Sequence, residues 1–97
     1  MATEYYYNGK LVKTSNGSKR AYKYAIYNKE TGECANFSEA REPLEKKRMD
    51  SLWKAQRTVS AYVAAGVTNC EAFDYHKQRL AWWKAAMVVK LEKVVTD

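Results

Sequence analysis

The chain contains few of the residues from which catalytic and metal sites are usually built. Its 97 residues include one histidine, His76, two cysteines, Cys34 and Cys70, one proline and four glycines. One histidine excludes a His-pair metal site, and no further pair of soft ligands accompanies His76 and Cys70. The glycines stand alone in turn sequences and form no phosphate-binding loop. We therefore predict that the protein is not an enzyme and carries no metal or cofactor.

Long apolar runs are also missing. No stretch of about 18 consecutive apolar residues occurs, so we expect no segment to span a membrane. The first residues, MATEYYYNGK, lack the apolar core of a secretory signal peptide. Two cysteines permit at most one intramolecular disulfide. These features predict a cytoplasmic protein with reduced thiols.

The composition is that of a folded, basic protein. Hydrophobic residues make up 46% of the chain and aromatic residues 13%, which is typical of one compact domain over residues 1–97. The formal net charge is +6. An excess of positive charge favours association with nucleic acid or with acidic proteins, but it does not indicate a fold.

Residues 4–37 have the pattern of an antiparallel β-meander. Asn8-Gly9 is a strong hairpin signal between two short extended runs. A second polar turn follows, and Lys19–Tyr27 then alternates as the longest strand candidate. The segment NKETG, residues 28–32, predicts a last turn before a strand at Glu33–Phe37. Three or four strands result, depending on whether the first two runs form separate strands.

Residues 38–66 have a helical pattern. Pro43 predicts a break or restart near its position, and Gly66 predicts the end of the helix. A core-facing stripe is expected from the apolar spacing: Met49, Leu52, Gln56, Val59 and Val63, with Trp53 and Tyr62 at its edges. The opposite face is expected to be solvated: Lys46, Lys47, Asp50, Lys54 and Arg57.

Residues 67–97 are predicted to form one long C-terminal helix. Thr68-x-x-Glu71 matches a capping box, and neither Gly nor Pro follows before Val95. The helix would be roughly 27 residues long, with apolar side chains on two opposite faces. Either it is the middle layer between the sheet and the preceding helix, or its second face contacts a partner or another copy.

These elements predict an α+β domain in which an N-terminal meander packs on a hairpin of two long α-helices. Two candidate binding surfaces follow. The first is the tyrosine-rich, basic face of the sheet: Tyr5, Tyr7, Lys10, Lys13, Lys19, Arg20, Lys23 and Tyr27. The second is a helix interface: Lys47, Lys54, Arg57, Tyr75, Trp82 and Val89.

The sheet face has three interpretations. Its tyrosines can pack in the core with their hydroxyl groups at the rim. They can contact a protein partner as large, rigid side chains. They can also stack on unpaired bases while the lysines neutralise phosphates. Self-association through residues 88–95 is a further alternative for the helix interface.

The order of three strands, then Phe37-Ser38-x-Ala40 and a helix, resembles two families of DNA-binding domains. These are the plant ethylene-response factors and the arm-binding modules of tyrosine recombinases. The resemblance covers residues 4–60 and implies a three-stranded sheet in the major groove with one helix on its back. The Trp and Arg strand positions of these families are not reproduced, so no residue is assigned from them.

The small, basic, motif-free chain is also similar to phage and mobile-element accessory proteins, including inhibitors of nucleases and of CRISPR effectors. That similarity implies action by covering a surface. We therefore expect a small non-enzymatic binding protein that occludes or bridges a macromolecular surface. The expected partner is a protein or nucleoprotein complex, such as a host nucleic-acid-processing or defence complex. The alternative is direct binding of DNA or RNA through the Tyr/Lys face.

Overall fold

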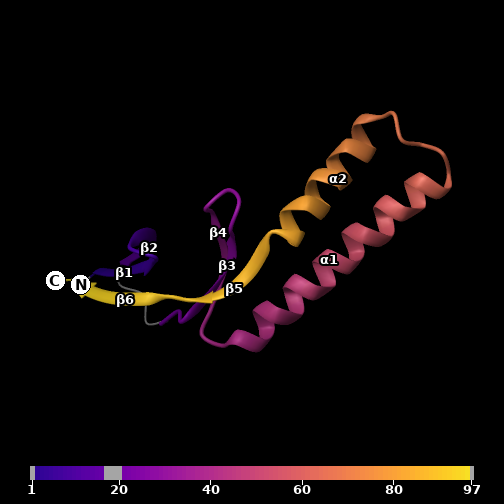
Figure 1. The fold of residues 1–97 in the computed structure, drawn as a ribbon. Helices are drawn as coiled ribbons and strands as arrows, with labels where there is room; N and C mark the ends of the chain where they lie inside the picture. The colour runs from indigo at the N-terminus through magenta and orange to yellow at the C-terminus, as the bar shows by residue number, and fades with distance from the viewer. Residues whose placement is uncertain (1, 17–20, 97) are drawn as a thin grey trace.

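The fold combines two small sheets with a helical hairpin (Figure 1). A computed structural model describes residues 2–16 and 21–96. Within these ranges the chain forms two antiparallel three-stranded sheets and two helices that pack together. The α+β class is therefore confirmed. The single N-terminal meander is wrong, because each sheet takes its third strand from the C-terminal segment.

The first sheet has the order β2-β1-β6. It consists of β1 (Ala2–Tyr7), β2 (Lys10–Asn16) and β6 (Glu92–Thr96). Asn8 and Gly9 join β1 to β2 with φ angles of 52° and 76°. Two consecutive left-handed residues are what a two-residue hairpin turn requires, which is why Asn-Gly predicted this turn correctly.

The second sheet has the order β4-β3-β5. It consists of β3 (Tyr24–Asn28), β4 (Cys34–Ser38) and β5 (Ala86–Lys90). Asn36 has a φ of 58° and lies at a bulge, because Ile26 pairs with Ala35 whereas Ala25 pairs with Phe37. The predicted strand Lys19–Tyr27 is shorter than expected, and its first two residues lie outside the described ranges.

The predicted long C-terminal helix is wrong. Helix α2 (Glu71–Lys84) ends after 14 residues, and β5 begins at Ala86. Only Leu91 separates β5 from β6, so the segment 86–96 pairs first with β3 and then with β1. Its paired valines, at 88–89 and 94–95, suit a pleated sheet better than a helix. Both strands that it joins come from the first third of the chain.

Helix α1 (Arg41–Ala64) is continuous, so the predicted break near Pro43 is wrong. Pro43 is the third helical residue, where the missing N–H would have no intrahelical partner. The predicted end at Gly66 is confirmed. Gly66 has a φ of 70° and donates its N–H to Val63 O, while Val67 donates to Tyr62 O, both at 3.0 Å. These two bonds form a Schellman motif.

The second sheet is the middle layer of the molecule, because alternate residues of β3 face opposite sides. Ala25 faces the first sheet and Ile26 faces the helices. The core between the sheets consists of Tyr5, Ala25, Val89 and Leu91. The core between the second sheet and the helices consists of Ile26, Leu44, Ala86 and Val88, with Tyr24, Trp82 and Trp83 packed on it. The expectation that the last helix is the middle layer is therefore wrong.

The molecule is elongated, with principal extents of 57 × 22 × 21 Å. We call α1, α2 and the connecting residues 65–70 the helical arm. The arm is attached to the second sheet at one end and extends away from it, while the chain termini lie at the opposite end of the molecule (Figure 1).

Asn28 joins the end of β3 to the base of the arm. It is almost completely buried. Its Nδ2 group donates to the carbonyl oxygen of Trp82 at 3.0 Å, and its Oδ1 atom accepts from the N–H groups of Glu30 and Thr31. One side chain therefore holds both the turn after β3 and the last turn of α2.

The N-cap of α2 is Cys70, so the predicted capping box at Thr68 is wrong. Cys70 is extended (φ −156°, ψ 160°), and its Sγ atom accepts from the N–H of Phe73 at 3.4 Å. Thr68 lies in the loop that follows the turn at Gly66, before the helix begins. Sulfur is a weak acceptor, so this cap is weaker than a hydroxyl cap would be.

Replacing Asn28 with Ala is expected to lower the free energy of unfolding by about 3 kcal/mol. The change removes three hydrogen bonds made by a buried side chain to part-buried backbone groups. Urea unfolding measures the effect. Gln78→Ala, at an exposed position on α2, is the control and should change the free energy by less than about 0.5 kcal/mol. A similar small effect at Asn28 would contradict its linking role.

Replacing Cys70 with Ser is expected to raise the free energy of unfolding by about 0.5 to 1 kcal/mol. Serine is a preferred N-cap residue, and its oxygen accepts a stronger hydrogen bond than sulfur. Cys70→Ala should lower stability instead. Thermal unfolding of both variants tests the assignment, and an equal loss in both would show that Cys70 does not act as the cap.

Candidate binding surface on the helical arm

The tyrosines of the first predicted surface point mainly into the core. Tyr5 is completely buried between the sheets. Tyr7 and Tyr27 are half-buried and pack together, with ring centroids 4.7 Å apart. The Tyr5 ring is also within 5.7 Å of the Tyr22 ring, and its hydroxyl oxygen accepts from the N–H of Tyr22. Tyr5 is thus inaccessible, and the prediction that it contacts a partner is wrong.

The basic residues of the same predicted surface each have different surroundings. Lys10 is exposed and donates to the carbonyl oxygen of Gly32 at 3.3 Å. The Lys13 ammonium group lies 4.9 Å from the Phe37 ring and 5.5 Å from the Tyr22 ring. Lys23 is exposed. The predicted Lys19 and Arg20 lie outside the described residues.

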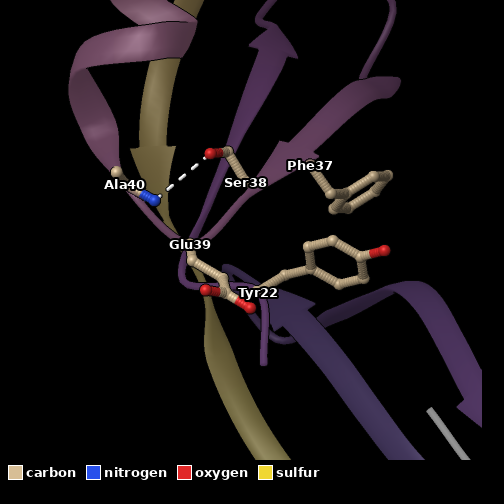
Figure 2. A pocket seen from close by; sticks show the side chains of 5 residues that line it. All are labelled: Tyr22, Phe37, Ser38, Glu39 and Ala40. Atoms are coloured by element: carbon tan, nitrogen blue, oxygen red, sulfur yellow. Dashed lines mark hydrogen bonds between the residues drawn. The ribbon is translucent and has the colours of Figure 1, made fainter. Parts of the chain in front are cut away.

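A shallow pocket of about 380 Å³ lies where the second sheet joins α1 (Figure 2). The Tyr22 and Phe37 rings lie next to each other on one side, tilted by 57°, and the Glu39 carboxylate lies near Tyr22 (Figure 2). Ser38 is committed to the backbone, because its Oγ atom accepts from the N–H of Ala40 at 3.2 Å. One carboxylate among five lining residues provides neither a nucleophile with a base nor an acid–base pair.

The reactive side chains of the described residues do not come together elsewhere. Cys34 is half-buried beside the first sheet, and burial raises the pKa of its thiol although Lys10 opposes the shift. The thiol therefore stays protonated at neutral pH and is a poor nucleophile. His76 lies on the arm, stacked near Tyr62. No cluster of three His, Cys, Asp or Glu residues within the described ranges could hold a metal ion.

The arm exposes two residues that were expected to face the core, Met49 and Val63, together with Trp53, which was expected at the edge of the core-facing stripe. Trp53 is 63% exposed, Val63 56% and Met49 47%. Helix α1 instead turns Leu44 and Ala55 inward. The stripe continues through the exposed Gln56 and Ser60. We call Met49, Trp53, Gln56, Ser60 and Val63 the Trp53 seam.

A groove of about 320 Å³ runs beside the seam, between α1 and the end of α2. It is lined by Leu52, Trp53, Gln56, Arg57 and Lys84. None of the described residues that line it is acidic. The acidic side chains of α1 that form ion pairs do so elsewhere: Glu45 with Arg41 and Arg48, and Asp50 with Lys46. The groove is therefore apolar with two cationic walls.

The predicted helix interface is only partly brought together. Arg57 reaches the groove, and Lys47 and Lys54 are exposed on α1. Tyr75 is exposed on α2 next to Arg79, with 6.0 Å between the guanidinium carbon and the ring. Trp82 packs against the core beneath the arm. Val89 is buried in β5, so the expectation that it shares a helix face with Tyr75 and Trp82 is wrong.

Trp53 was predicted at the edge of the core stripe and not as a binding residue, although a signal for its exposure was present. At about 100° per residue, Trp53 lies within about 40° of Lys46 and Arg57, both on the solvated face. A Trp among charged residues on one side of a helix indicates a contact surface as well as a core edge.

Comparisons with protein-family models, curated proteins and solved structures found no match to this chain. Neither helix, as far as the residues are described, is long and apolar enough to cross a membrane. We therefore infer function from the exposed surface of the arm.

The two tryptophans on the arm should respond differently to truncation. Trp82→Ala is expected to lower the free energy of unfolding by about 3 kcal/mol, because its partly buried ring packs against the core cluster between the second sheet and the helices. Trp53→Ala should change it by less than about 0.5 kcal/mol, because that ring is exposed. Urea unfolding of both variants distinguishes core from surface, and equal losses would contradict the exposure of Trp53.

Proposed function

We propose that the protein is a small non-enzymatic binding protein that attaches to a macromolecular partner through its helical arm. It acts by occluding or bridging the partner's surface. The exposure of Trp53 on the protruding arm carries this proposal. A folded chain gains little by leaving a tryptophan, a methionine and a valine in one exposed line unless something covers them.

The side chains of the seam suit a protein partner. Tryptophan is enriched among the residues that dominate binding energy, because it buries a large area with few rotatable bonds. Arg57 provides a second residue type enriched at such sites. A nucleic-acid backbone would neutralise the cations but would leave the apolar seam uncovered. A protein or nucleoprotein complex is therefore the preferred partner.

The proposed partner class is a host nucleic-acid-processing or defence complex, with this chain as a phage or mobile-element inhibitor. The net charge of +6 supports an approach to a nucleoprotein assembly. The proposal places the protein in the cytoplasm. The free cysteines Cys34 and Cys70 support a reducing compartment.

Direct binding of DNA or RNA is the alternative. The burial of Tyr5 and the mutual packing of Tyr7 and Tyr27 weaken it, because these rings are occupied by the core and by one another. Of the basic residues predicted for the sheet face, the structure describes three, and two of these, Lys10 and Lys23, are exposed.

Capture of a partner from a lysate of the host is expected to survive nuclease treatment and to be lost when Trp53 is changed to Ala. Removing a hot-spot side chain typically weakens binding by about thirtyfold or more. Tyr75→Ala is the matched control, because Tyr75 is similarly exposed (56%) on α2. Quantitative mass spectrometry of the captured proteins measures the effect.

A salt titration with naked DNA and RNA tests the alternative. Direct binding should lose about one log unit of affinity per log unit of salt for each phosphate neutralised. Tight, strongly salt-dependent binding that Trp53→Ala leaves unchanged would contradict the arm-based proposal. Capture that depends on Tyr75 but not on Trp53 would place the binding face elsewhere on the arm.

A further inference from the structure

The geometry of the arm points to a more specific occupant: we propose that the Trp53 seam and its groove receive an acidic amphipathic α-helix of the partner protein. The partner helix would lie along the arm and complete a three-helix unit. This inference rests on the proposed function and names the chemistry that the arm recognises.

The spacing of the seam is that of a helix–helix contact. Its five residues follow one another at alternating steps of about four and three, as in a coiled-coil seam with a 3.5-residue period. All five are exposed. From Met49 to Val63 the seam is about 21 Å long, at 1.5 Å per residue. A partner helix of about four turns would cover this length.

The centre of the seam is polar. The Nε2 group of Gln56 donates to Ser60 Oγ at 3.2 Å, between Trp53 on one side and Val63 on the other. A polar residue at a seam position fixes register and partner choice at some cost in affinity. The apolar anchors of the partner are therefore expected opposite Trp53 and Val63, with a polar residue between them.

The positive charge of the groove predicts that the partner helix carries negative charge. Arg57 comes from α1 and Lys84 from α2, so each wall supplies one cation. Among the described residues, neither cation forms an ion pair within the chain. Asp or Glu residues flanking the apolar stripe of the partner would pair with both. Rim charges of this kind speed association and exclude wrongly charged partners.

A second copy of this chain is a poorer occupant. Paired copies would place one cationic groove against another, so Arg57 and Lys84 would face a surface that carries the same sign of charge. Residues 17–20 are the only internal segment that the structure does not describe. Their sequence, GSKR, contains no apolar side chain that could cover the seam. An acidic helix from another protein fits the groove best.

Selection from a displayed library of random peptides of about 16 residues, long enough for four helical turns, tests the proposal directly. The purified full chain is the target, and Trp53→Ala is used for counter-selection. We expect enriched peptides with apolar residues at helical spacing and an excess of Asp and Glu beside them. Synthetic copies should become helical on binding, as measured by circular dichroism.

The charge of the groove is tested with the same peptides by fluorescence anisotropy. Arg57→Glu combined with Lys84→Glu should weaken binding about tenfold at low salt, and by less at about 0.5 M salt. Lys47→Glu combined with Lys54→Glu is the matched control, with the same change in net charge at exposed positions about 100° or more from Trp53 around α1. This control should change the affinity by less than about twofold.

Several results would overturn the inference. They are an absence of enriched peptides, enrichment of peptides without acidic residues or helical spacing, and equal losses for the two charge-reversed variants. Sedimentation that shows a dimer of wild type but not of Trp53→Ala would identify a second copy as the occupant. Trp53-dependent capture from a lysate alongside any of these results would preserve the proposed function and reject only the acidic helix.

Discussion

The pairing of residues 86–96 with two strands from the beginning of the chain holds the whole structure together. β5 is hydrogen-bonded to β3 in one sheet, and β6 is hydrogen-bonded to β1 in the other. Between them Leu91 is buried in the core between the sheets and donates its N–H to the carbonyl oxygen of Lys23 at 2.8 Å. Without this segment each sheet would be a two-stranded hairpin, which is marginally stable at best in water.

The same segment fixes the base of the arm. Helix α2 leads into β5 through Ala85 alone, and the Ala85 carbonyl oxygen accepts from the N–H of Lys29. Trp82 and Trp83 pack on the second sheet, while the arm extends away from that sheet (Figure 1). The arm is therefore held firmly at one end and presents most of its length to solvent. That arrangement suits a rigid projection with a contact surface along it.

Local signals in the sequence predicted the turns and the first helix well. Asn8-Gly9 and Gly66 were placed correctly because each demands a left-handed backbone that few other residues adopt. The strands of the two hairpins also follow from alternation and turn residues. The C-terminal strands did not follow, because the absence of Gly and Pro permits a helix without requiring one. Whether Val88 and Val89 form a strand depends on β3, which is distant in sequence.

The candidate site was predicted less well than the fold for a related reason. Alternation shows that Tyr5 and Tyr7 share a face of β1, but it does not show whether that face is covered. Here a second sheet covers it. On α1 the apolar residues occupy a wide arc, and periodicity alone does not show which part of the arc faces α2. The side of α1 that carries Tyr62 faces α2, because the Tyr62 ring lies 6.0 Å from the Phe73 ring, whereas Trp53 is exposed.

The register of the first sheet has a consequence for how the protein is made. Ala2 pairs with Thr96, so β1 leaves the ribosome well before its pairing partner β6. Until β6 is available, β1 has only β2 to pair with, and its other edge has no partner strand. Contacts between distant parts of a chain also slow folding. The β1 edge is therefore open to proteases and chaperones until β6 pairs with it.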